Sequence, residues 1–322
     1  MLKYVCKRIV LMLISAFIIM TMLFVMIRLL PNTVAAVQGG YDVALKQMRE
    51  AWGYNKPIMV QYAIFLKNVF TEFNWGFCTE VGTFLQPVTE YLADKLPYTV
   101  YVNFVSVLFS IPLGVIFGIL AAIFKNKWQD QVINVFIMIF ISVPSFVYAF
   151  VLQYYVGYKL NLFPLVMNGG KDFFSLSMLR SAAMPIMAMS FGTIAGDMRL
   201  VRAELTETLT SDYMLLARTK GLSRRQATVR HALRNSMVPL LPTFMADIIY
   251  VIMGSMIIEQ IFAVPGLGKT YLTSINMKDY SVFMCISMFY VIIGLAAGLL
   301  FDLSYGFIDP RIRMGGGKNN EL

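Results

Sequence analysis

Histidine and cysteine are almost absent from this chain, and their absence excludes whole classes of site. The only histidine is His231, and the three cysteines (Cys6, Cys78 and Cys285) lie far apart with no paired spacing. A metal centre or a disulfide framework needs several such residues at characteristic intervals. We therefore predict no metal site, no bound cofactor, no disulfide framework and no histidine-based catalytic centre.

Charged residues are also scarce, and apolar residues take their place. Only 14% of the 322 residues are charged, whereas 58% are hydrophobic, and the mean hydropathy is +0.67. This composition is too apolar for a soluble domain and predicts an all-α integral membrane protein. The formal net charge of +9 lies mainly in short segments between apolar runs and in the tails. Membrane topology explains that distribution, so we predict no nucleic-acid partner.

Six apolar segments are long enough to cross the hydrocarbon core of a bilayer as helices, at about 20 residues each. They cover residues 9–30, 98–124, 131–157, 178–198, 236–262 and 281–304. The first is too long for the apolar part of a signal peptide, so we interpret it as an uncleaved span. Loops rich in Lys and Arg lie in the cytoplasm. Basic residues occur between spans two and three, between spans four and five, and after span six, so we expect both termini in the cytoplasm.

Residues 31–97 are then extracytoplasmic, with five basic and six acidic residues. Apolar residues recur at helical intervals over 41–52 and 57–73, which predicts two short amphipathic helices. Both binding to the membrane surface and packing against the spans are compatible with this pattern. Arg28, at the outer end of the first span, is an exception to the charge rule that snorkelling accommodates.

A basic block at residues 199–234 is the most informative segment. It contains eight Arg or Lys residues and three acids, with Gly221 near its middle. The pattern predicts a helix over 205–220 with Asp212 as a candidate cap, a left-handed turn at Gly221, and a second helix capped by Ser223. A helical hairpin of this kind projects as a rigid knob to which a soluble partner can dock. A plain loop bound to anionic lipid is the alternative.

The sequence DYMLLARTKGLSRRQATVRHALRNSMVP (212–239) resembles the cytoplasmic signature loop of ABC importer permeases, in the version found in the peptide/nickel family. EQIFAVPGLGKTYL (259–272), MKDYSVF (277–283), DLSYGFIDPRIR (302–313), KYVCKRIVLMLI (3–14) and RLLPN (28–32) resemble further motifs of that family. The resemblance covers nearly the whole chain. PNTV at 31–34 and the charge of Asp247 depart from the family pattern and leave the cargo open.

The resemblance implies a type I importer permease of about six spans in a bacterial cell membrane. It divides the chain into residues 1–30, an outer segment at 31–97, a permease domain at 98–308 and a tail at 309–322. The implied partners are a second homologous permease, two cytoplasmic ATPase subunits, an extracytoplasmic binding protein and the lipid bilayer. The residues implied in coupling to the ATPases are Asp212, Ala217, Arg218, Lys220, Gly221, Arg224, Arg225, His231, Arg234 and Asn235.

The sequence AVPGLGKT (263–270) fits a loose nucleotide-binding pattern. A phosphate-binding loop follows a buried strand in a soluble α/β domain, whereas this one follows an apolar segment. We therefore predict an external turn shaped by Pro265, Gly266 and Gly268 and anchored by Glu259. This chain is then a transport subunit rather than an enzyme, and ATP hydrolysis belongs to the partner chains.

Asp247 is the best functional candidate among the ionisable residues inside the spans. A position on the translocation path and a hydrogen-bonded contact between helices both suit it. His231 is interpreted as a packing or hydrogen-bonding residue. A secondary transporter with Asp247 as its coupling carboxylate is the alternative function, although no internal repeat supports it. A membrane-embedded enzyme is disfavoured because no nucleophile or acid/base pair converges. Peptides, nickel chelates and oligosaccharides all remain possible cargo.

Overall fold

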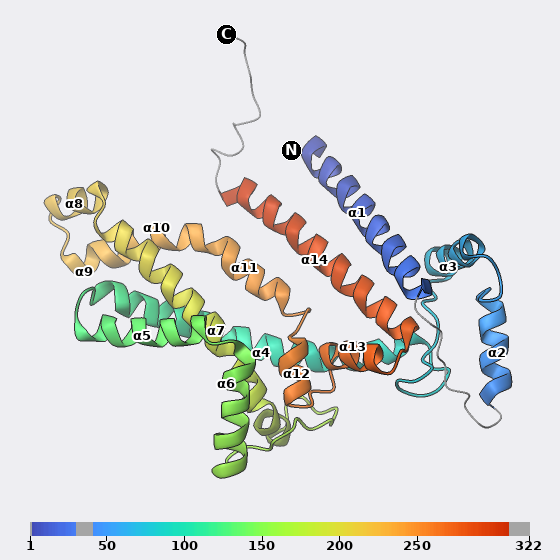
Figure 1. The fold of residues 1–322 in the computed structure, drawn as a ribbon. Helices are drawn as coiled ribbons and strands as arrows, with labels where there is room; N and C mark the ends of the chain where they lie inside the picture. Colours follow the sequence, from blue (N-terminus) through green and yellow to red (C-terminus); the bar gives the residue numbers. More distant parts are fainter. Residues whose placement is uncertain (1, 30–40, 309–322) are drawn as a thin grey trace, which may run out of the picture. The chain divides into compact units, whose positions relative to one another are not determined.

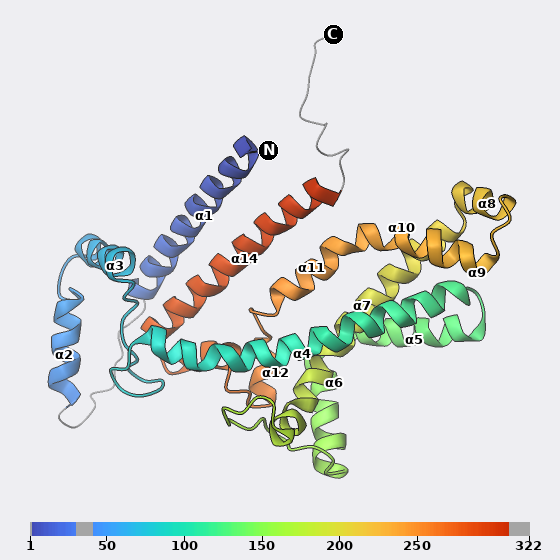
Figure 2. The same cartoon turned by 180° about the vertical axis from the view of Figure 1, so that it is seen from behind.

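A computed structural model describes residues 2–29 and 41–308 of the chain (Figures 1 and 2). Within these residues the only β pairing is an isolated bridge between Phe77 and Pro87, so the predicted all-α fold is confirmed. The residues PNTV at 31–34 and DPRIR at 309–313, which the sequence analysis used, lie outside the described ranges. The chain forms two compact units, Met1–Lys95 with Thr270–Ala296 and Leu96–Lys269 with Ala297–Leu322.

The first unit contains α1 (Leu2–Leu29), α2 (Tyr41–Ala51) and α3 (Ile58–Glu72), so both predicted amphipathic helices are confirmed. Helix α3 packs one face against α1, where the rings of Phe24 and Phe65 lie 5.0 Å apart and Thr21 hydrogen-bonds Tyr62 at 2.5 Å. Met59 of the same helix is 78% exposed. One face of α3 therefore packs against α1, and part of the helix stays exposed.

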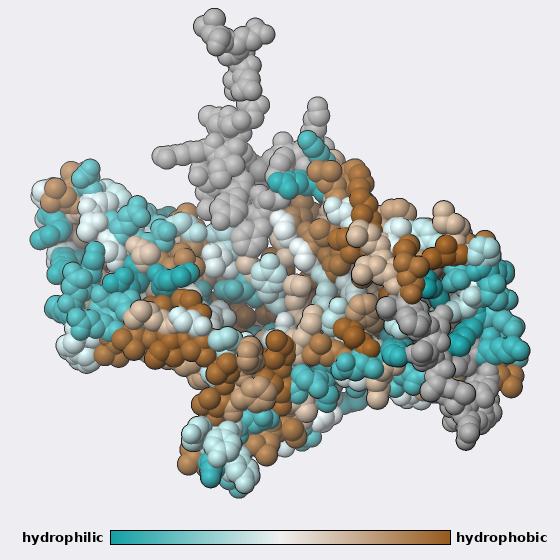
Figure 3. All heavy atoms as spheres, in the orientation of Figure 1, coloured by the Kyte–Doolittle hydropathy of each residue, from teal (hydrophilic) through white to brown (hydrophobic). Residues whose placement is uncertain are grey.

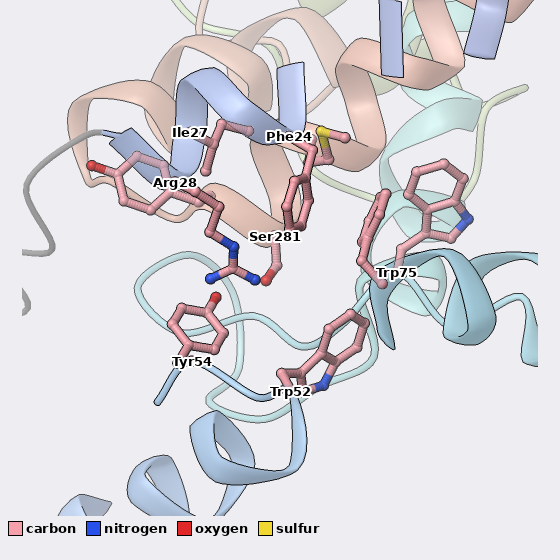
Figure 4. Close-up of a pocket in the computed structure, with 10 residues that line it drawn as sticks. Phe24, Ile27, Arg28, Trp52, Tyr54, Trp75 and Ser281 are labelled. Carbon is pink, nitrogen blue, oxygen red and sulfur yellow. The ribbon is translucent and has the colours of Figure 1, made fainter. Parts of the chain in front are cut away.

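The guanidinium of Arg28 is held by aromatic rings at the end of α1. It lies 3.7 Å from the ring centroid of Tyr54 and 5.1 Å from that of Phe24. Figure 4 shows it above Tyr54 in a pocket that Trp52 and Trp75 also line. Cation–π attraction of this kind stabilises the charge without a carboxylate. It gives the basic residue at the C-terminal end of the first helix a specific place in the fold.

The carboxylate of Asp279 ties the loop at residues 79–81 to the beginning of α14 (Tyr280–Ile308). One of its oxygens accepts hydrogen bonds from the backbone N–H groups of Thr79, Glu80 and Val81 at 2.7, 3.0 and 3.2 Å. The other accepts from Val282 N at 3.4 Å, in the first turn of the helix. Asp279 is fully buried. This anchor therefore joins two segments of the first unit that are about 200 residues apart in the sequence.

The second unit is built on two long helices, α4 (Val88–Ile123) and α7 (Leu176–Leu209). The part of α4 that belongs to this unit begins at Leu96. Between them α5 (Trp128–Ser142) and α6 (Ser145–Leu152), with a π-helical continuation Gln153–Lys159, are bent by 103° at Pro144. Proline removes a backbone donor and restricts the residue before it, which ends α5 at this point. The core between α4, α6 and α7 includes the buried side chains of Val102, Ala149 and Ala182.

The expected continuous span at 236–262 is wrong. The segment is divided into α10 (Leu233–Met237), a 3-10 turn (Val238–Leu240), α11 (Leu241–Tyr250) and α12 (Met256–Ile261). The break between α11 and α12 contains Gly254 at φ +67° and Ser255, whose side chain caps α12. An apolar window cannot detect this break, because the residues on both sides of it are as hydrophobic as those of a span.

Four helices in the described residues are long and apolar enough to cross a membrane, and the bent pair α5–α6 raises the number to five. Many of their side chains are exposed: only 11% of the α1 window is buried. A hydrophobic surface covers α6, whereas hydrophilic residues gather over the end that carries α8 (Asp212–Thr219) and α9 (Arg224–Ala227) (Figure 3). The apolar faces match a lipid environment, in which such exposure costs nothing.

Candidate functional site

The basic block folds into a helical hairpin whose turn is at Gly221. The N–H of Gly221 donates to Arg218 O at 3.0 Å, and the N–H of Leu222 donates to Ala217 O at 3.3 Å. Gly221 adopts φ +89°, the left-handed region that favours glycine at the end of a helix. No heavy atom lies within 4 Å of where a Cβ would be placed, so only the backbone conformation requires glycine here.

The second half of the hairpin begins at a capping box. The Ser223 hydroxyl accepts from Gln226 N at 3.3 Å, and the Gln226 side chain accepts from Ser223 N at 3.1 Å. The predicted cap at Ser223 is therefore confirmed. The prediction that Asp212 caps the first helix is wrong, because α7 continues to Leu209, a break follows, and Ser211 precedes α8. Asp212 instead lies in the first turn of α8, where a carboxylate still stabilises the helix dipole.

The hairpin is attached to the long helices by a small apolar core. Ala122 of α4 and Leu205 of α7 pack with Met214 and Ala217 of α8, and with Ala227 and Ala232 beyond the turn. All are at most 7% exposed. The hairpin is therefore a folded knob whose base belongs to the second unit, and a force applied to it reaches α4 and α7 through packed side chains.

The outer face of the hairpin combines apolar and basic residues. Tyr213, Leu215 and Leu216 are 40%, 63% and 55% exposed. The basic residues of the candidate set are all exposed around them (Arg218, Lys220, Arg224, Arg225 and Arg234). Exposed leucines next to a turn cost solvation energy unless a partner or a membrane covers them. This arrangement is typical of a docking surface.

Three of the predicted coupling residues, Ala217, His231 and Asn235, differ in how far they are buried. Ala217 is buried in the apolar core, so it supports the hairpin rather than contacting a partner. His231 is exposed, so it does not pack in the core of the hairpin, and the hydrogen-bonding role stays a prediction. Asn235 is exposed, and its side chain lies close to that of Tyr213.

Sequence reasoning missed an ion pair at the root of the hairpin. Arg202 of α7 donates from Nε and from a terminal nitrogen to the two oxygens of Asp130, at 2.6 and 2.9 Å. The Asp130 carboxylate is nearly buried and also accepts from Asn126 N at 2.9 Å. A bidentate pair of this kind is strong and directional. The two partners are 72 residues apart, so the only sequence signal was an acid beside the basic loop between spans two and three.

Glu259 anchors the turn at 263–268, as predicted. One carboxylate oxygen accepts from the backbone of Gly268 and Lys269 at 2.7 and 3.1 Å, and the other accepts from the Thr99 hydroxyl at 2.9 Å. The Thr99 oxygen in turn accepts from Leu267 N at 2.8 Å. Glu259 is fully buried. A Cβ on Gly266 would approach a Glu259 oxygen to 2.5 Å, so these glycines are required by close packing.

This geometry also argues against nucleotide binding at the motif AVPGLGKT (263–270). The motif follows α12 rather than a strand and leads into α13 (Leu267–Asn276). The first amides of a helix attract anions, but those of α13 are already bonded to the carboxylate of Glu259. A nucleotide phosphate would have to displace this buried carboxyl group.

Asp247 lies on the wall of a cavity in the second unit. The cavity has a volume of about 190 Å³ and lies between α4, α7 and α11. One oxygen of Asp247, Oδ2, is buried and has no hydrogen-bond partner among the described residues. This position favours a role for Asp247 at the cavity over a role in a hydrogen-bonded contact between helices.

Comparison with known proteins places the chain in a family. Residues 114–314 match the family described as binding-protein-dependent transport system inner membrane component, and residues 1–103 match the N-terminal domain of the same components. The chain is 35% identical to the dipeptide transport system permease protein DppB of Lactococcus lactis subsp. cremoris, over 98% of this chain and 100% of the relative. It is 30% identical to the protein of the same name in Bacillus subtilis, over 98% and 99%.

A third relative is the oligopeptide transport system permease protein OppB of Haemophilus influenzae, 29% identical over 97% of this chain and 100% of the relative. These matches confirm a permease subunit of an ABC importer and do not favour a secondary transporter or an enzyme. The protein is a multi-pass component of the inner membrane. Together, the hairpin, the apolar helices and the comparisons show that the chain belongs to the family of binding-protein-dependent transport system inner membrane components.

Proposed function

We propose that this permease subunit imports peptides and that the hairpin around Gly221 receives force from a cytoplasmic ATPase. The proposed complex contains a second homologous permease, two ATPase subunits and an extracytoplasmic binding protein. Relatives named for dipeptide and oligopeptide transport cover nearly the whole chain and support peptide cargo. Nickel chelates and oligosaccharides are the alternative cargo.

The observation that carries this proposal is the hairpin itself. It exposes Leu215, Leu216 and several basic residues, whereas its base is packed against α4 and α7. A partner that docks on this face moves the packed base only if its contacts differ between two states of the complex. ATP-driven closure of the ATPases is such a change, and alternating access of the spans is its proposed result.

Purification of the tagged chain from its native membrane, followed by reconstitution in proteoliposomes, tests the function. We expect two ATPase chains and a homologous permease to copurify, and alanyl-alanine to accumulate only with ATP on the hairpin side. Uptake that persists without ATP and follows an ion gradient would contradict the proposal. Retention of nickel chelates or oligosaccharides instead of peptides would change the cargo but not the subunit assignment.

The proposed topology places residues 31–97 outside and the hairpin and both termini in the cytoplasm. A cysteine at Val60, which is 40% exposed, should react with an impermeant thiol reagent in intact cells. A cysteine at Arg224 should react only after permeabilisation. Equal labelling of both in intact cells would reverse the topology.

The native cysteines permit this measurement once Cys6, which is exposed, is replaced by serine. Burial and, to a lesser extent, the nearby charge of Asp279 raise the pKa of Cys78 to about 12. The thiolate is the reactive form, so Cys78 should contribute almost no background at pH 8. Cys285 is buried as well.

A further inference from the structure

The cavity beside Asp247 has room for one side chain but not for a whole peptide. Its volume is about 190 Å³, whereas a water molecule occupies about 30 Å³ and complete ligand sites measure about 300 Å³ or more. Asn103, Ser106 and Val107 of α4 line it together with Met189 and Thr193 of α7. Asp247, Tyr250, Val251 and Gly254 complete the wall. The residues of α4 and α7 lie well inside two long apolar helices.

The polar groups around the cavity leave the charge of Asp247 without a counterion. The Asn103 amide donates to Thr99 O at 2.6 Å, and the Ser106 hydroxyl pairs with Ser190 at 2.9 Å. These two residues are 5% and 3% exposed. Both are already bonded to groups of α4 or α7, and Asp247 Oδ2 has no partner in the described part of the chain.

A second carboxylate lies near Asp247. Asp197 lies one helical turn after Thr193 on α7, is 2% exposed, and interacts electrostatically with Asp247. Its Oδ2 also lacks a hydrogen-bond partner within the described residues. By contrast, Asp130 has its own cation in Arg202. Buried carboxylates without partners are costly, so a cation that enters the cavity removes part of this cost.

The remaining walls indicate the shape of that cation. Val107, Met189 and Val251 supply apolar surface beside the carboxylate. Lysine and arginine side chains combine an aliphatic stem with a charged head and suit such a mixed site. A peptide α-ammonium has no stem of this kind. No group of three or more His, Cys, Asp or Glu residues suited to a metal occurs in the described ranges.

We propose that the cavity between α4, α7 and α11 is a subsite for the ammonium or guanidinium group of a lysine or arginine side chain in the cargo. This inference rests on the proposed peptide cargo. Asp247 provides the direct contact, and Asp197 adds negative charge behind it. Neutral peptides are transported without this interaction, so the subsite changes preference and not the ability to transport.

Uptake of a matched peptide pair measures this preference in the reconstituted complex. Lysyl-alanine carries the ammonium, and norleucyl-alanine has a similar stem without it. Losing a hydrogen bond to a buried charge corresponds to about tenfold or more. We expect Asp247→Asn to lower the lysyl/norleucyl uptake ratio by about tenfold, Asp197→Asn to lower it less, and Asp247→Glu to retain most of it. Equal changes for both peptides in Asp247→Asn would overturn the subsite.

A labelling experiment tests the cavity without any assumption about the cargo. Thr193→Cys in a Cys6→Ser background is treated with a trimethylammonium-ethyl or a sulfonatoethyl methanethiosulfonate. With Asp247 present, the cationic reagent should react faster relative to the anionic one, and Asp247→Asn should lower this ratio about tenfold. An unchanged ratio would contradict the inference. Failure of the wild type to transport either peptide would contradict the peptide cargo alone, since the labelling ratio still reports the cationic subsite.

Discussion

The hairpin at Gly221 and the turn at 263–268 both depend on glycine, but for opposite reasons. Gly221 has a left-handed backbone, and the space around it is open. Gly266 and Gly268 lie against the buried carboxylate of Glu259, which a Cβ would approach to 2.5 and 3.0 Å. One glycine is required by conformation and the others by packing.

The difference shows how one chain combines an exposed segment with a buried, tightly bonded one. The hairpin exposes its polar and apolar groups, and it is held only at its base by a small apolar core. The turn satisfies every oxygen of Glu259 with backbone or hydroxyl donors inside the protein. Segments with few buried contacts change position at low free-energy cost, whereas buried hydrogen-bonded networks do not.

The largest effect is expected at the packed turn. Gly266→Val places a branched side chain against Glu259 and Thr99, so the network must separate. Overpacking together with unpaired buried groups should cost about 3 kcal/mol or more. We expect the assembled complex to be lost or strongly depleted in membranes, measured by copurification. Normal yield and thermal stability would show that the turn is not tightly packed.

A smaller effect is expected when the anchor itself is changed. Glu259→Ala leaves the amides of Gly268 and Lys269 and the Thr99 hydroxyl without their acceptor, at about 3 kcal/mol. Glu259→Gln keeps an amide oxygen for the two backbone donors and should cost about 1 to 2 kcal/mol. Thermal unfolding of the purified complex measures both. Equal losses in the two variants would mean that charge, rather than hydrogen bonding, holds the turn.

Lys269→Ala tests whether the side chain at this turn, rather than its backbone, has a function. The backbone N–H of residue 269 still donates to Glu259 after this change, and nucleotide is proposed to bind in the ATPase chains. ATP hydrolysis by the complex should therefore change less than about twofold. Loss of nucleotide binding by the isolated chain after this substitution would restore the nucleotide-loop interpretation.

The sequence was most informative where local chemistry decides the structure. Gly221, Ser223 and the amphipathic helix at 58–72 follow from residue type and spacing, and the structure confirms them. The break between α11 and α12 was missed because the segment is apolar throughout. Asp130–Arg202 and Asp279 with its three amides join residues 72 to 200 positions apart. No local pattern reports which distant partner a buried charge will find.

The cavity shows the same limit at the candidate site. The charge of Asp247 in an apolar segment was visible in the sequence and marked it as a candidate residue, which the structure places on the cavity wall. Asp197 was not identified, because it lies next to the basic block and resembles an ordinary residue at a helix end. Only the packing of α7 against α4 and α11 brings the two carboxylates into one environment.

The most direct test of the central claim compares Gly221→Val with Gly221→Asn in reconstituted complexes. Asparagine tolerates the left-handed conformation, whereas valine does not, and the strain of about 1 to 3 kcal/mol should leave the spans inserted. We predict that Gly221→Val retains its partner subunits but loses about tenfold of the binding-protein-stimulated ATP hydrolysis, with Gly221→Asn close to wild type. Normal docking with normal stimulated hydrolysis and uptake in Gly221→Val would contradict the role of the hairpin as the coupling element.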